Sequence, residues 1–197
     1  MRDALMSTGR DIFYSICNWG EEDTWKWASS VGNSWRTTED ISNDWTSVEY
    51  NFKLSQVHFE ISGPGGWNDP DMLEVGNSKL TIDEEKTHFA LWALAKAPLI
   101  IGADLTTINP ASLEIIKNKN LISVNQDPNS KQATCRLGCD YIFDAAKEPS
   151  VFATTVTGGD TVAIIVNWRF EVLKEFSFTF GDLGIVPRAN QIIKVVD

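Results

Sequence analysis

The sequence predicts an α/β fold over residues 1–126 and a small antiparallel β domain over residues 127–197. Short apolar runs begin near residues 12, 34, 57 and 98 and alternate with helical patterns, which is typical of a parallel sheet covered by helices. After Asp127-Pro128 the pattern changes to strand-like runs with no helical stretch between them.

The first two units each combine an extended run with a helix. We expect a strand over Ile12–Cys17, because FYSIC is rich in strand-forming residues. A helix is expected over Glu21–Val31, where three acidic residues suit the positive end of the helix dipole. Ser34–Ile41 is a polar extended run, and Asp44–Leu54 has apolar residues at helical spacing.

The third unit contains the clearest helix of the chain. A strand is expected over Val57–Ile61, followed by a glycine-rich loop and a further extended run over Trp67–Leu73. The helix is expected over Thr81–Ala97, where Thr81 and Glu84 form a capping-box pattern.

The fourth unit is an uninterrupted apolar run, Pro98–Ala103, as expected of a strand buried on both faces. A short helix over Pro110–Lys117 follows. The four units recur about every 30 residues, the pitch of a closed eight-fold barrel. Spacing alone therefore leaves two alternatives, half of such a barrel or a small open α/β sheet.

The C-terminal part has several candidate strands and a hairpin signal. Gly158-Gly159 is typical of a tight turn between two strands. We expect a β-sandwich built from the following runs: Val151–Val156, Thr161–Trp168, Glu175–Phe180 and Ile192–Val196.

Charge and hydropathy argue against two classes of partner. The formal net charge is −10 and the pI about 4.7, so nucleic acid and anionic membrane surfaces are not expected partners. The longest apolar stretch, Phe89–Ala103, is interrupted by Lys96 and Pro98 and is too short to span a bilayer. The first residues lack the apolar region of a signal peptide. We therefore weigh a cytosolic protein against a missing N-terminal segment, and favour the second.

The three cysteines suggest a local disulfide. Cys135 and Cys139 flank a Leu-Gly pair that could turn the chain back, so a disulfide is plausible in an oxidising compartment. Free thiols are the alternative, and a zinc site would need two more ligands. Cys17 is left unpaired.

Candidate site residues follow the expected strands, where a barrel carries its reactive groups. Carboxylates, amides and Trp side chains converge there, a mixture that suits a neutral sugar. Each also has a structural interpretation: the Trp side chains as core, Asp40 as a helix cap and Asp69 as a turn residue. The four places are Cys17-Asn18-Trp19, Trp35 to Asp40, Trp67 to Met72, and Asp104.

The string GPGGWNDPDML, Gly63–Leu73, resembles the segment found in melibiase-type retaining α-galactosidases of glycoside hydrolase family 27 and in α-N-acetylgalactosaminidases. Four further strings match in order and spacing: YSICNWG, SWRTTEDI, ALWALAKAPLIIGADL and VNQDP. The resemblance implies the second half of a TIM (β/α)8 barrel, strands five to eight, over residues 1–126, followed by an antiparallel β-sandwich. It also implies hydrolysis of terminal α-galactosides with retained configuration, without cofactor or metal.

The resemblance assigns roles to individual residues. Asp40 is the expected acid/base, and Arg36 in the same W-R-x-x-x-D pattern is expected to bind a sugar hydroxyl and orient the carboxyl. Asp71 and Met72 resemble further sugar contacts. Asn18 and Trp19 occupy the specificity segment, where many relatives carry Glu in place of Asn.

The nucleophile has no counterpart here. Retaining chemistry needs two carboxyl groups about 5 Å apart, yet no string like the family's K-Y-D-N-C occurs in this chain. The 197-residue chain is therefore expected to be an inactive fragment of a secreted, lysosomal or vacuolar enzyme, with exposed barrel edges that favour self-association.

Two other functions stay open at this point. An α-N-acetylgalactosaminidase would need space beside the sugar's second carbon, which the loop Asn18–Trp25 controls. The acidic run Glu21-Glu22-Asp23 does not suggest such space, which favours galactose. A non-catalytic carbohydrate-binding remnant is the alternative outside the enzymes.

Overall fold

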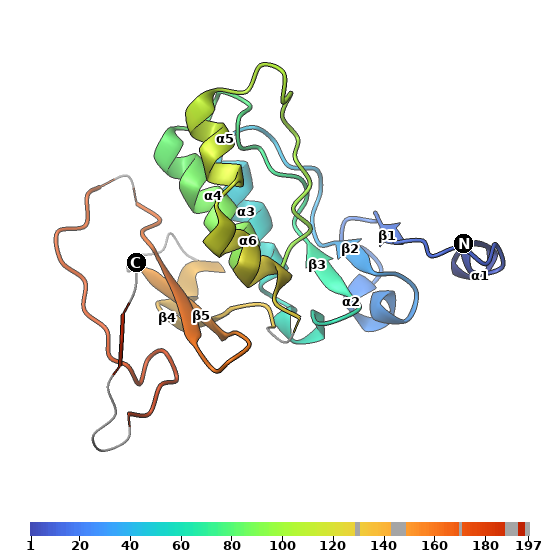
Figure 1. Ribbon diagram of the computed structural model, residues 1–197. Coiled ribbons are helices and arrows are strands. Elements are labelled where there is room, and N and C mark those ends of the chain that lie inside the picture. The colour runs from blue at the N-terminus through green and yellow to red at the C-terminus, as the bar shows by residue number, and fades with distance from the viewer. Residues whose placement is uncertain (129–130, 143–148, 170, 188–192, 196–197) are drawn as a thin grey trace.

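The computed structural model describes residues 1–128, 131–142, 149–169, 171–187 and 193–195, with mixed helix and sheet (Figure 1). The α- and 3-10 helices of these residues are α1 Arg2–Met6, α2 Thr24–Trp27, η1 Ala28–Ser30, α3 Trp45–Ser55, η2 Phe59–Ile61, α4 Ile82–Leu94, α5 Pro110–Ile116, α6 Lys119–Gln126 and η3 Cys139–Ile142. The strands are β1 Ser15–Ile16, β2 Ser34–Arg36, β3 Trp67–Asp69, β4 Thr134–Leu137, β5 Ser150–Thr155 and β6 Thr161–Val166.

The first sheet is parallel, with the order β1-β2-β3. Ser34 pairs with Trp67, and two residues later Arg36 pairs with Asp69. The expected parallel pairing is therefore present. Because all three strands run the same way, the loops that follow them leave from the same edge.

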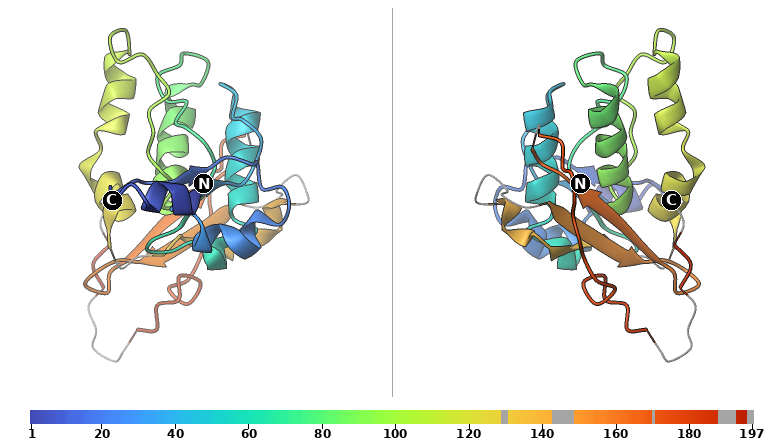
Figure 2. Two further views of the ribbon diagram at one scale, coloured as in Figure 1. Left: turned by 90° about the vertical axis from the view of Figure 1, so that its right-hand side faces the viewer. Right: turned by 90° about the vertical axis from the view of Figure 1, so that its left-hand side faces the viewer.

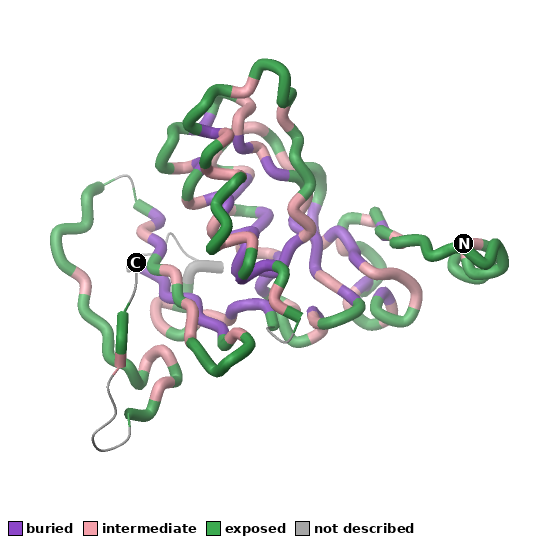
Figure 3. Tube along the Cα trace, in the orientation of Figure 1, coloured by how far each residue is buried: buried purple, intermediate pink, exposed green. Residues whose placement is uncertain are grey.

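Helices α3 and α4 lie side by side next to this sheet, and α5 and α6 follow each other along α4 (Figures 1 and 2). Side chains cap the starts of α3 and α4, and the cap at α4 is the one that the sequence predicted. Thr81 and Glu84 form a complete capping box at α4, and the Asp44 carboxylate accepts the Ser47 N–H at 2.9 Å to start α3. Buried residues run along α4 (Figure 3), including Phe89, Leu91 and Trp92.

The second sheet is antiparallel, with the order β4-β5-β6. Gly158 and Gly159, both at positive φ, make the turn between β5 and β6 as expected. Its buried Phe152 meets Phe52 of α3 edge to face at 5.2 Å between ring centroids. The predicted disulfide joins Cys135 to Cys139. A second sheet facing this one is not among the described residues, so the sandwich stays a prediction.

The strand expected over Val57–Ile61 is wrong. Val57 donates its N–H to Leu54 at the end of α3, and Phe59–Ile61 forms the 3-10 helix η2. The strand that pairs with β2 is instead β3, at Trp67–Asp69. Apolar and polar residues alternate over Val57–Ile61, which is typical of a strand. The run that hydrogen-bonds to β2 is nevertheless Trp67–Asp69, so only that run is part of the sheet.

The strand expected over Pro98–Ala103 is also only partly formed. Ile101 makes one isolated parallel bridge to Leu73, and no ladder extends it. Ile100 is 50% exposed, which contradicts burial on both faces.

Other boundaries differ from expectation. The first strand is only Ser15–Ile16, and the helix expected from Glu21 begins at Thr24 because Glu22 and Asp23 are in the left-handed region. Glu175–Phe180 forms no strand. The run Ile192–Val196 lies partly outside the described residues, and its described part, 193–195, is not a strand.

Candidate active site

The candidate site is built on the carboxyl ends of β2 and β3. Arg36 ends β2 and Asp69 ends β3, and the register places them opposite each other. The loops after these strands carry Asp40 and Asp71. The parallel sheet therefore brings together polar residues about 30 positions apart in the sequence, as the sequence pattern predicted for this edge.

Arg36 is the centre of the cluster. Its Nη2 lies 2.7 Å from Asp71 Oδ2 and 3.1 Å from Asp40 Oδ1. The same nitrogen donates to the main-chain carbonyl of Glu39 at 2.7 Å, which fixes the loop that bears Asp40. The Asp40 side chain is 72% exposed, so a solvent-facing carboxyl is held against an almost buried guanidinium.

Asp71 is held in a strained conformation by several hydrogen bonds. Its φ is +85°, a region that residues with a side chain rarely adopt. Its N–H donates to Asp69 Oδ1 at 2.9 Å, and its carboxylate accepts the N–H groups of Met72 and Ile41, each at 2.8 Å. The 38% exposed Met72 lies next to it at the same edge.

Asp69 stabilises a turn, which is the structural role that the sequence offered as an alternative to a role in the site. It is buried and accepts the Asp71 N–H two positions on. Burial raises its pKa, while the Asp71 hydrogen bond and Arg36 lower it in part.

The loop after β1 carries Asn18 and Trp19 against the loop after β2. Gly20 has φ +78°, and a Cβ there would lie 2.7 Å from the Thr37 carbonyl oxygen, so only glycine allows this approach. The Asn18 amide is engaged within its own loop, donating to the Glu21 carbonyl at 2.9 Å and accepting from Thr24 Oγ1 at 2.8 Å. Trp19 is 45% exposed.

Asp104 does not join this cluster through any hydrogen bond or ion pair among the described residues. It accepts the N–H and hydroxyl of Thr106 and so fixes its own exposed turn. These hydrogen bonds lower the pKa of Asp104.

Sequence reasoning missed several residues that support the cluster. Asn51 of α3 is buried and donates to the carbonyls of Glu39 and Pro70, which joins the two loops. The indole N–H of Trp92 donates to the Asp71 carbonyl at 2.7 Å. A partial signal was available for α4, where Glu85, His88 and Trp92 recur at helical spacing.

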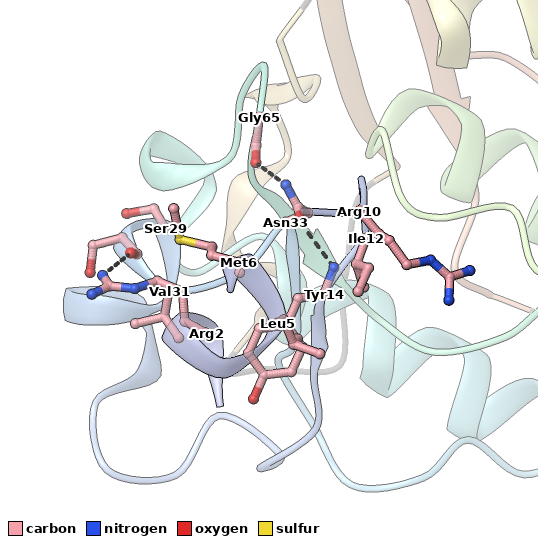
Figure 4. Close-up of a pocket in the computed structure, with 12 residues that line it drawn as sticks. Arg2, Leu5, Met6, Arg10, Ile12, Tyr14, Ser29, Val31, Asn33 and Gly65 are labelled. Carbon is pink, nitrogen blue, oxygen red and sulfur yellow. Dashed lines mark hydrogen bonds between the residues drawn. The ribbon is translucent and has the colours of Figure 1, made fainter. Parts of the chain in front are cut away.

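Two cavities lie near the first sheet. The larger, about 270 Å³, lies between α1 and the residues before β1 and β2, with Asn33 accepting the Tyr14 N–H beside it (Figure 4). It is at the opposite end of the strands from Asp40 and Asp71. The smaller, about 170 Å³, adjoins Arg36 and is lined by the stacked pair Trp25 and His58.

Within the described ranges, no three His, Cys, Asp or Glu side chains gather as a metal site would require. No helix among the same residues is long and apolar enough to cross a membrane.

Comparison with known proteins shows the family of this chain. A family model described as alpha galactosidase A (Melibiase_2) matches residues 1–127. Alpha-galactosidase 3 of Arabidopsis thaliana is 55% identical over 128 residues, which is 65% of this chain and 29% of that protein. Alpha-galactosidase 2 of Saccharomyces cerevisiae is 40% identical over 193 residues, covering 85% of this chain and 41% of the relative.

Solved structures that resemble this chain are also described as α-galactosidases. The α-galactosidase MEL1 of Saccharomyces cerevisiae matches with a TM-score of 0.75 and 34% identity over 85% of this chain and 42% of its own. A Bacteroides fragilis protein described as a putative alpha-galactosidase/melibiase matches with a TM-score of 0.78 and 35% identity, over 85% of this chain and 38% of its own. This chain spans less than half the length of each of these proteins. Because the family model covers residues 1–127 of 197, the chain belongs to the melibiase family of alpha galactosidase A.

Proposed function

We propose that this chain is part of a retaining α-galactosidase in which Asp40 is the acid/base. The observation that carries the proposal is the bonding of Arg36 to both Asp40 and Asp71 at one edge of a parallel sheet. One exposed carboxyl is thereby oriented beside a second carboxylate, that of Asp71, which is largely buried and ion-paired with Arg36.

The proposed reaction also requires a carboxylate nucleophile, which none of the candidate site residues of this chain supplies. In the first step a carboxylate nucleophile attacks the anomeric carbon while Asp40 gives its proton to the departing glycosidic oxygen. In the second step Asp40, now a carboxylate, takes a proton from water, and the oxygen of that water displaces the nucleophile. This displacement inverts the anomeric carbon a second time, so the configuration of the substrate is retained overall. Arg36, Asp71 and Met72, with Asn18 and Trp19 from the loop after β1, bind the sugar.

The finer architecture belongs to the same proposal. Residues 1–126 form strands five to eight of a TIM barrel, and residues 127–197 form the antiparallel β-sandwich. The parallel order β1-β2-β3 and the similarity to enzymes more than twice as long support this division. The exposed run at Ile100 and Ile101 is then a strand whose neighbour lies in the other half of the barrel.

Galactose is the sugar we propose, supplied as an α-galactoside of an oligosaccharide or glycoconjugate. A Saccharomyces cerevisiae α-galactosidase structure similar to this chain, with 34% identity, is described as holding raffinose. In this chain the Asn18–Trp25 loop is closed by the bonds of Asn18 and Thr24, which supports a narrow pocket over one that admits an acetyl group. A secreted, lysosomal or vacuolar location is proposed for the whole protein.

The test uses the natural full-length protein and its Asp40→Ala variant. Proton NMR of p-nitrophenyl α-galactoside hydrolysis is expected to show α-galactose as the first product. The variant is expected to be slow, and sodium azide is expected to restore turnover and give α-galactosyl azide, because azide needs no base to displace the nucleophile. First-formed β-galactose, or no azide product from a folded variant, would contradict the assignment.

A further inference from the structure

The polar side of α4 holds the segment that follows β3 by its main chain. Glu85, His88 and Trp92 are spaced by three and four positions, so they lie on one side of the helix. All three side chains are buried in a helix whose other buried residues are apolar.

Each of the three bonds a different main-chain group of the segment 71–76. Trp92 Nε1–H donates to the Asp71 carbonyl at 2.7 Å. His88 Nε2 accepts the Glu74 N–H at 2.9 Å. Glu85 Oε1 accepts the Gly76 N–H at 2.8 Å, while its other oxygen accepts the Ser112 hydroxyl of α5.

The segment needs such support because its own geometry is strained. Asp71 has a φ of +85°, whereas the +93° of Gly76 is a conformation that glycine adopts readily. A non-glycine residue in that region persists only where the surroundings impose it. Three hydrogen bonds from one rigid helix, together with the Arg36 ion pair, supply that constraint.

The burial of His88 leaves one of its ring nitrogens without a hydrogen bond in the described part of the chain. It is fully buried, and its Nδ1 has no hydrogen-bond partner among the described residues. Burial lowers the pKa of His88 to about 3, so Nε2 keeps its lone pair and can accept the Glu74 N–H at ordinary pH. A buried orphan donor is destabilising by itself. The hydrogen bond that Nε2 accepts from the Glu74 N–H offsets part of this free-energy cost.

We infer that Glu85, His88 and Trp92 are positioning residues that fix Asp71 and Met72 for sugar binding. They touch no substrate themselves and act through the main chain of residues 71–76. The inference rests on the proposed function, since it assumes that Asp71 and Met72 contact the sugar.

The variants separate a lost hydrogen bond from lost packing. Trp92→Phe removes the indole N–H, and His88→Leu removes the acceptor. His88→Gln replaces the acceptor, because a Gln side-chain oxygen can reach the place of Nε2. Phe89→Leu is the matched control: Phe89 is a buried neighbour on α4 whose side chain has no polar atom to bond the segment.

Steady-state kinetics of the full-length protein with p-nitrophenyl α-galactoside, and inhibition by galactose, give the first readout. Trp92→Phe and His88→Leu are expected to raise KM and the galactose inhibition constant about ten-fold, with kcat within about three-fold, the signature of lost uniform binding. His88→Gln and Phe89→Leu are expected to stay within about three-fold of wild type. Equal effects of His88→Leu and Phe89→Leu, or no rescue by a folded His88→Gln, would overturn the inference.

Hydrogen exchange followed by mass spectrometry gives a readout that needs no activity. The amides of Glu74 and Gly76 are expected to be protected in wild type and His88→Gln, and the Glu74 amide to lose protection in His88→Leu. If the wild-type protein hydrolyses no α-galactoside, the proposed function fails, and exchange still decides whether α4 holds the segment. Unchanged protection in His88→Leu would refute the positioning role.

Discussion

The guanidinium Nη2 of Arg36 lies 2.7 Å from Asp71 Oδ2, and the two side chains are only 9% and 13% exposed. This ion pair ties the end of β2 to the loop after β3 at the candidate site. The neighbouring pair of Arg36 with Asp40 differs in one respect that matters for stability, because the Asp40 side chain is 72% exposed.

Arg36→Leu is expected to destabilise the full-length protein by about 3–5 kcal/mol, because it leaves the largely buried Asp71 carboxylate without its charged partner. Asp40→Asn is expected to change the free energy of unfolding by less than about 1 kcal/mol, since exposed ion pairs contribute little. Urea denaturation measures both. Similar losses in the two variants would mean that the Arg36–Asp71 ion pair does not contribute more to stability than the exposed Arg36–Asp40 pair.

Asp40→Asn is expected to impair a natural galactoside more than a p-nitrophenyl galactoside. A good leaving group needs little protonation in the first step, whereas an alcohol leaving group depends on the acid. The measurement is kcat/KM on raffinose and on p-nitrophenyl α-galactoside for both proteins. Equal losses on the two substrates would count against Asp40 as the acid/base.

The 197-residue chain by itself is expected to show no α-galactosidase activity. Without the nucleophile the covalent step is lost, which usually costs several orders of magnitude in rate. Pure protein is assayed with p-nitrophenyl α-galactoside, with Asp40→Asn as the control for contaminating enzyme. Turnover that disappears in Asp40→Asn would show that a carboxylate within this chain serves as nucleophile.

The same isolated chain is expected to self-associate. Ile100 and Ile101 are 50% and 37% exposed, and Phe13, just before β1, is 63% exposed. Apolar surface left exposed to water is unfavourable by about 25 cal/mol of free energy per Å². Strand edges without a neighbour also form hydrogen bonds with strands of other chains. Size-exclusion chromatography with light scattering measures the mass. A single 22.0 kDa species with a cooperative melt would show that the chain closes its own core.

Acid is expected to destabilise the full-length protein partly through His88. Burial lowers the pKa of His88 from 6.5 to about 3, so between these values the unfolded chain binds a proton that the folded chain does not. The free energy of unfolding therefore falls as the pH drops from 6.5 towards 3, by up to about 1.4 kcal/mol per pH unit from this group.

His88→Gln removes that term and is expected to flatten the dependence in urea denaturation at pH 7, 5.5 and 4.5. Asp69, whose pKa is raised by burial, contributes with the opposite sign in both proteins and cancels in the comparison. Parallel curves for the two proteins would show that His88 is not buried in the neutral form.

The sequence by itself determined the local features of this protein. Capping residues set the starts of α3 and α4, the glycine pair set the β5–β6 turn, and the short Cys spacing predicted the disulfide. These depend on neighbours a few positions away, so propensity and spacing suffice to predict them. The family motifs likewise named Arg36, Asp40 and Asp71 before any contact between them was known.

Only the tertiary structure decided which runs became strands and how the site is held. Val57–Ile61 and Trp67–Asp69 both have strand-like patterns, and the second joined the sheet because its backbone meets β2. The left-handed Asp71 is likewise held by tertiary contacts, and the hydrogen bonds from His88 and Trp92 to the segment 71–76 join residues 14 and 21 positions apart in the sequence. Such hydrogen bonds form only when the chain is folded, so no local pattern in the segment 71–76 predicts them.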